Sequence, residues 1–86
     1  MNETLCFQEF KNLAARLDIE IRYIHEGPSG LCTVKGKRAL FIDKNLDRRR
    51  QLDIFVRDFK TLDLEGFFIV PVIRKLLGMD NEDADW

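Results

Sequence analysis

The sequence predicts a single α+β domain, in which a small three-stranded antiparallel sheet packs with about three helices in the order α–β–β–β–α–α. Two stretches space their apolar residues three and four apart, as amphipathic helices do. Between them, residues 19–23 alternate apolar and polar side chains, the two-residue period of a strand. Residues 30–46 then show two short strands joined by a tight turn and followed by the second helix. The chain has 86 residues, enough for one domain, which we place at 1–78 with an acidic tail at 79–86.

The first helix is expected over residues 3–17, where the apolar residues recur on one face. Asn2 or Thr4 is a suitable N-cap, and Asp18 ends the pattern. The side chains that share the apolar face are Cys6, Phe10, Leu13, Ala14 and Leu17.

The hairpin is expected from residues 31–34 and 38–43. Gly36 lies between them and can adopt the positive φ that a tight hairpin loop requires. The returning strand is apolar on both faces over residues 39–42, and strands of that kind are usually central in a sheet. It lies either in the middle of the antiparallel sheet, or between helices on one side and a partner on the other.

Two further helices complete the domain. The second is expected from Asp47, a good N-cap, to about Leu62. Its apolar stripe consists of Leu52, Phe55, Val56 and Phe59. The third is expected over residues 71–77, because Pro71 suits a first helical turn and Gly78 suits a left-handed C-terminal cap.

Composition predicts a packed cytoplasmic protein. The hydrophobic fraction is 45% and seven Phe supply large apolar side chains, so we expect a core rather than disorder. No apolar run approaches the ~18 residues that span a bilayer, and the N-terminus lacks the features of a signal peptide. Without an export signal, Cys6 and Cys32 are expected to be reduced residues that face the core.

No arrangement of residues indicates an enzyme, a cofactor or a metal site. His25 is the only histidine and Ser29 the only serine, and no Cys-x-x-Cys occurs. A pair of Cys32 and His25 across the hairpin is conceivable as nucleophile and base, but a buried structural Cys32 is the simpler interpretation. The carboxylates Asp53 and Asp58 fall on a helix where Arg49 and Arg57 offer ion pairs, which explains them without catalysis.

Positive charge gathers in one stretch of a chain whose net charge is −1. The basic residues that we single out are Lys35, Lys37, Arg38, Arg48, Arg49 and Arg50. They are candidate contacts for nucleic acid, which would need one contiguous patch. The returning strand separates the hairpin tip from the helix start by roughly 20 Å, so two small patches, or an ordinary solvated surface, are the alternatives.

Surplus apolar surface gives our leading hypothesis, a non-catalytic module that binds another protein or itself. Phe67, Phe68 and Ile69, together with the two-faced strand, exceed what three short helices easily cover. We therefore predict a protein partner or a homo-oligomer, with nucleic-acid binding as the alternative and no membrane contact.

Two resemblances accompany this interpretation. Residues 41–46 (Phe-Ile-Asp-Lys-Asn-Leu) and the following helix resemble the front of the ImmA/IrrE-type zinc metallopeptidases. That family's HExxH motif would fall near residues 56–60, which read Val-Arg-Asp-Phe-Lys, so the resemblance implies at most a degenerate relative without activity. The Gly30-Leu-Cys hairpin and the Pro71-Val-Ile-Arg ending are also similar to a family of small bacterial proteins without assigned function.

Overall fold

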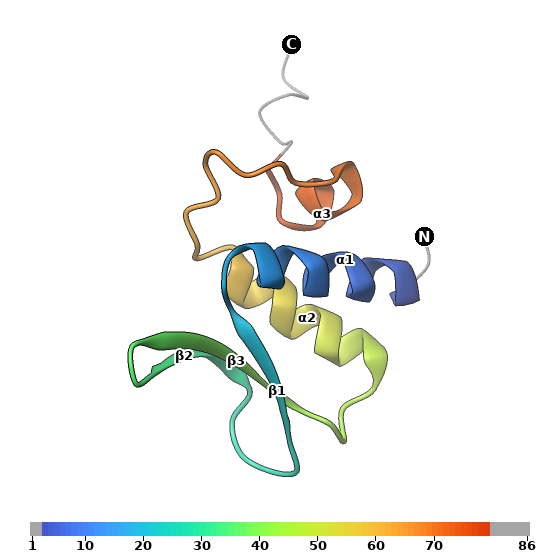
Figure 1. Ribbon diagram of the computed structural model, residues 1–86. Coiled ribbons are helices and arrows are strands. Elements are labelled where there is room, and N and C mark those ends of the chain that lie inside the picture. Colours follow the sequence, from blue (N-terminus) through green and yellow to red (C-terminus); the bar gives the residue numbers. More distant parts are fainter. Residues whose placement is uncertain (1–2, 80–86) are drawn as a thin grey trace.

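The computed structural model describes residues 3–79 and shows an α+β fold with three strands and three helices (Figure 1). The element order confirms the predicted α–β–β–β–α–α. The elements are α1 (Glu3–Arg16), β1 (Glu20–Ile24), β2 (Gly30–Val34), β3 (Lys37–Asp43), α2 (Arg48–Phe59) and α3 (Pro71–Leu76). Residues 80–86 of the predicted acidic tail lie outside the described range, and Met79 packs against the core.

The sheet is mixed, so the prediction of a purely antiparallel sheet is wrong for one strand pair. The strand order is β1-β3-β2, with β2 antiparallel and β1 parallel to the central β3. Residues 25–29 join β1 to β2 and reach at most about 18 Å, too short to cross β3 and also run back along a strand. Consequently β1 and β2 run in opposite directions, and since the hairpin reverses β2 into β3, β1 must run parallel to β3.

The hairpin turn has the geometry that its sequence predicts. Lys35 and Gly36 are its two central residues and both have positive φ, +53° and +81°. Two consecutive positive φ values define the type I′ turn, whose twist matches that of the flanking strands. The register it sets places Cys32 opposite Ala39 and Leu31 opposite Leu40.

The core forms where α1 and α2 cover one face of the sheet. Four phenylalanines, Phe7, Phe10, Phe55 and Phe59, meet between the two helices, with the rings of Phe10 and Phe55 stacked at 5.1 Å between centroids. Leu40 and Ile42 of β3 are fully buried beneath them. Aromatic pairs at such distances add to the free energy of burial, so this cluster anchors the helices to the sheet.

The remaining helix, α3, lies on the side of α1 away from the sheet (Figure 1). Pro71 occupies its first turn and Gly78 follows it at φ +74°, as predicted. Ile73 is 1% exposed and fixes the helix to the core. Within residues 3–79, none of the helices is both long enough and apolar enough to cross a bilayer.

The helix α2 begins as expected. The side chain of Asp47 accepts a hydrogen bond from the backbone N–H of Arg50 at 2.9 Å. Nearby, Gln51 is buried and donates from Nε2 to the backbone oxygen of Leu46 at 3.0 Å. These two bonds satisfy backbone groups that would otherwise be unpaired at the helix start.

Candidate functional site

The sheet has one face under the helices and one face without a covering element. On β3, Leu40 and Ile42 belong to the core beneath α1 and α2. Their neighbours Ala39 and Phe41 point the opposite way, because side chains alternate along a strand. The second face, here called the open sheet face, carries the apolar residues Ile24, Cys32, Val34, Ala39 and Phe41.

The strand register supports this division. Ile21 and Leu31 lie beside Leu40 in the register and pack against the core. Ile24, Val34 and Phe41 are apolar and half-buried, yet none of them packs against the core cluster. Ala39, on the same face of the central strand, is only 2% exposed.

Two shallow hollows lie on this face. One, of about 530 Å³, is lined mainly by apolar groups, among them Ile24, Pro28, Cys32 and Phe41, with Glu26 at its margin. The other, of about 250 Å³, lies toward the hairpin tip and is lined by Arg22, Val34, Ala39 and the two lysines Lys35 and Lys37. The open sheet face therefore has an apolar centre with charges of different sign toward its two ends.

Glu20 and Arg22 form an ion pair among the residues that line the second hollow. Arg22 Nε lies 3.1 Å from Glu20 Oε2, and both side chains are close to half exposed. The hydrogen bond from Arg22, followed by its positive charge, lowers the pKa of Glu20, and Lys37 adds a smaller effect in the same direction.

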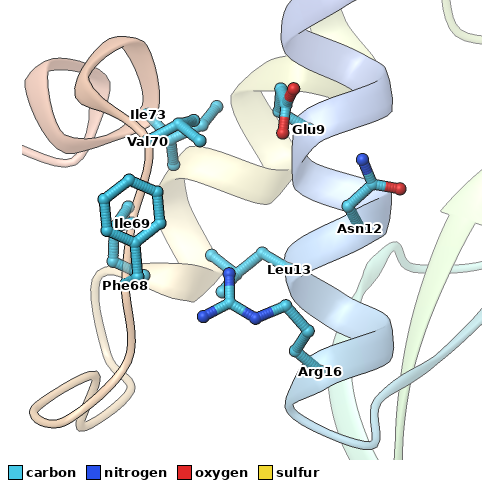
Figure 2. A pocket seen from close by; sticks show the side chains of 8 residues that line it. All are labelled: Glu9, Asn12, Leu13, Arg16, Phe68, Ile69, Val70 and Ile73. Carbon is cyan, nitrogen blue, oxygen red and sulfur yellow. The ribbon is translucent and has the colours of Figure 1, made fainter.

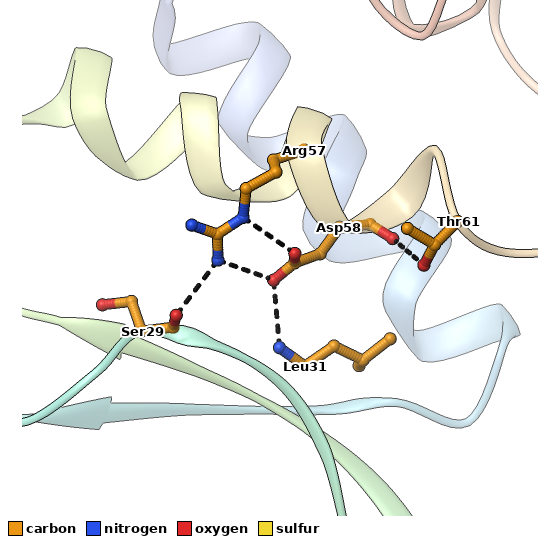
Figure 3. Close-up of polar contacts among 5 residues, drawn as sticks. All are labelled: Ser29, Leu31, Arg57, Asp58 and Thr61. Atoms are coloured by element: carbon orange, nitrogen blue, oxygen red, sulfur yellow. Dashed lines mark hydrogen bonds and ion pairs between the residues drawn. The ribbon is translucent and has the colours of Figure 1, made fainter.

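One margin of the face is held by an ion pair from α2 (Figure 3). Asp58 accepts a hydrogen bond from the backbone N–H of Leu31 at 3.0 Å, and Arg57 donates to the backbone oxygen of Ser29 at 3.0 Å. Arg57 also binds Asp58 through two of its nitrogens, at 2.9 and 3.1 Å. Asp58 holds the pKa of Arg57 above its usual value. The loop before β2 is thereby fixed to the helix.

This clamp was not apparent from the sequence. Asp53 was expected to pair with Arg49 and Arg57, and the structure retains only the contact with Arg49, at 3.9 Å. Arg57 instead binds its neighbour Asp58 and reaches a loop that lies 28 residues earlier in the chain. A contact over that separation leaves no periodic pattern in the sequence.

The expectation that both cysteines face the core is wrong for Cys32. Cys6 is buried as predicted, at 3% exposure, whereas Cys32 is exposed on the open sheet face. The physical reason is the alternation along β2, since Leu31 takes the inward position and leaves Cys32 facing outward.

The basic residues form two groups rather than one patch. Lys35, Lys37 and Arg38 lie at the hairpin tip, and residues 48–50 begin α2 beyond the other end of β3 (Figure 1). Several are engaged locally: Arg38 donates to the backbone oxygen of Leu17 at 2.8 Å, and Lys37 lies 3.8 Å from Asp18. The nucleic-acid alternative stays a prediction, without one continuous basic surface behind it.

The basic residues at the start of α2 also have partners within the domain. The guanidinium of Arg48 lies 4.4 Å from the ring centroid of Phe7, a cation–π contact. Arg49 is within 3.8 Å of Glu3 and 3.9 Å of Asp53. Arg50 is exposed, and its backbone N–H is bound by the helix cap.

The predicted apolar interface of Phe67, Phe68 and Ile69 is divided by the fold, and Figure 2 shows two of these residues, Phe68 and Ile69. Ile69 is 3% exposed and belongs to the core, which removes it from any surface. Phe68 is 69% exposed beside a small hollow of about 20 Å³ between α1 and the segment before α3. Phe67 is partly shielded by Arg16, whose guanidinium lies 5.9 Å from its ring centroid. Phe67 is nevertheless 39% exposed, so two of the three predicted residues, Phe67 and Phe68, remain at the surface.

Among residues 3–79, no three His, Cys, Asp or Glu side chains gather closely enough to hold a metal ion. His25 is exposed, and its backbone oxygen accepts a hydrogen bond from Asn45 Nδ2 at 2.9 Å. The open sheet face is accordingly the feature most suited to function.

Comparison of the chain with models of protein families, with curated proteins and with solved structures found no match. The resemblances to the metallopeptidases and to the small bacterial family thus stay predictions.

Proposed function

We propose that this domain is a non-catalytic protein-binding module whose docking surface is the open sheet face. The observation that carries the proposal is the set of half-buried apolar side chains, Ile24, Val34 and Phe41, that pack neither against a helix nor against the core. Apolar area left in water is unfavourable by about 25 cal/mol per Å². A partner that covers this face would recover that free energy.

The shape of the face favours a protein partner over a small molecule. Binding sites for small molecules usually enclose most of their ligand in a concave cleft. The hollows here are shallow and spread over three strands. A broad, nearly flat apolar surface with charged margins matches the anatomy of protein interfaces, in which an apolar centre is surrounded by a polar rim.

Site-specific photo-crosslinking in the native cell tests this proposal. A photoreactive phenylalanine analogue replaces Phe41, and the matched control carries it at Lys11, an exposed residue of α1. We expect a discrete, light-dependent adduct from position 41 that the additional substitution Ile24→Lys abolishes. An adduct pattern that is identical at both positions, or no adduct at position 41, would refute the proposal.

A further inference from the structure

We infer that the occupant of the open sheet face is a second copy of this chain, packed face to face with its strands reversed. This inference rests on the proposed function, because it names the partner of the same surface. It is carried by the distribution of charge at the two ends of that surface.

The end of the face near the hairpin tip is positive. Lys35 and Lys37 line the hollow there, and Arg22 in the same hollow is offset by Glu20. Asp18 lies 3.8 Å from Lys37, but both side chains are more than half exposed, which leaves that pair weak. The lysines therefore determine the sign of this end.

The opposite end is negative. Glu26 lines the apolar hollow beside Phe41. Asp43 is the last residue of β3 and lies beside Ile24 in the register. The two ends are separated by the length of β3, about 20 Å for its seven residues. The face thus carries charges of opposite sign at its two ends, with the apolar residues between them.

Symmetry then selects one arrangement. Two identical faces can meet about a two-fold axis that lies in the interface, either along the strands or across them. An axis along the strands would place the lysines over the lysines of the partner. An axis across the strands places Lys35 and Lys37 of one copy over Glu26 and Asp43 of the other, and does so twice. The observed charges favour the second arrangement.

The area of the face indicates a weak complex. Three strands at a spacing of about 4.8 Å and about 20 Å in length give a flat area of roughly 300 Å². Stable complexes bury about 800 Å² on each partner. We therefore expect dimers that form in the high micromolar range or above and that depend on the charged ends for their orientation.

A charge-exchange experiment tests the arrangement. Lys35→Asp brings the hairpin-tip end to zero net charge, because Lys37 remains there, and Glu26→Lys does the same at the other end, where Asp43 remains; Asp tolerates the positive φ at position 35. In sedimentation equilibrium up to about 1 mM, we expect each variant alone to self-associate roughly tenfold more weakly than the wild type. An equimolar mixture of the two should regain part of the association, because the unchanged negative end of one variant then meets the unchanged positive end of the other. Glu65→Lys, which changes the net charge as Glu26→Lys does, should associate like the wild type.

Cys32 supplies a second readout. In the reversed arrangement, sheets about 10 Å apart place the two Cys32 Cα atoms about 12 Å from each other, within reach of a short bismaleimide linker. We expect a crosslinked dimer from the wild type and none from Cys32→Ser, since Cys6 is buried.

These experiments distinguish the inference of a second copy from the proposed protein-binding function. A wild type that stays monomeric at the highest concentration and gives no Cys32 dimer overturns the inference of a second copy. If position 41 still gives a discrete adduct with another protein in the cell, the proposed function survives that result. A mixture of charge variants that associates no better than either variant alone overturns the reversed arrangement.

Discussion

The Arg57–Asp58 clamp is the most informative target for a stability measurement, through the substitution Asp58→Ala. Asp58 is 14% exposed and accepts from the backbone N–H of Leu31 at 3.0 Å. Removing a charged acceptor from a partly buried donor costs about 1.5–3 kcal/mol. The ion pair itself adds less than about 1 kcal/mol, because the Arg57 side chain is 60% exposed and its charge is screened by water.

We therefore expect Asp58→Ala to lower the free energy of unfolding by about 2 kcal/mol. For a domain of this size that corresponds to a fall in Tm of roughly 8 to 16 °C. Urea unfolding followed by circular dichroism measures the first quantity and a thermal scan the second. Amide hydrogen exchange should show faster exchange at Leu31, whereas Leu40 in the centre of the sheet should keep its relative protection.

Two further variants sharpen that measurement. Asp58→Asn retains an oxygen that can accept from Leu31 and should cost about 1 kcal/mol. Asp53→Ala removes an exposed carboxylate on the same helix, 3.9 Å from Arg49, and should cost at most about 0.5 kcal/mol. If Asp58→Ala and Asp53→Ala destabilise equally, and Leu31 exchange is unchanged, the clamp contributes no stability and the reasoning is wrong.

Three other predictions concern the hairpin and the sheet. Gly36→Ala places a side chain at φ +81° and should destabilise the domain by about 1 kcal/mol in urea unfolding; an unchanged midpoint would contradict the turn geometry. In the native protein a thiol reagent should modify Cys32 quickly and Cys6 only after unfolding, and equal rates at both would be inconsistent with the fold. Arg22→Gln should raise the pKa of Glu20 toward its ordinary value, as read from a carboxyl NMR titration. Because the folded pKa of Glu20 is lowered, the stabilisation from its ionised form is present above the unfolded pKa and disappears as the pH falls through the folded pKa. If Arg22→Gln leaves the titration of Glu20 unchanged, Arg22 is not the cause of the lowered pKa.

Local pattern determined most of the secondary structure in advance. The helical spacing around Phe10 and Phe55, the Lys35–Gly36 turn and the position of Pro71 each predicted an element that the structure contains. The central place of β3 was also predicted, from its apolar residues on both faces. These features depend on interactions between residues near one another in the chain.

Strand direction was missed because it depends on how separate elements combine. A central β3, a tight hairpin and a short 25–29 loop together require that β1 runs parallel to β3, although no one of them does so alone. The side that Cys32 faces was missed for a related reason. Residues 31–34 read Leu-Cys-Thr-Val, which lacks a clear alternation and so leaves two possible orientations. The sequence did indicate surplus apolar surface, but it could not show that Ile69 would be buried and Phe41 left uncovered.

The Arg57–Asp58 clamp has a consequence for how the sheet can grow. The backbone oxygen of Ser29 and the N–H of Leu31 are bound by side chains of α2. If a further strand added in parallel here, one of its residues would donate its N–H to the Ser29 oxygen and accept from the Leu31 N–H through its own oxygen. The side-chain pair thus substitutes for one residue of a fourth strand and blocks edge-to-edge addition at this end of β2. Aggregation through that edge is opposed, and the flat side of the sheet is left as the route by which β2 can meet another chain.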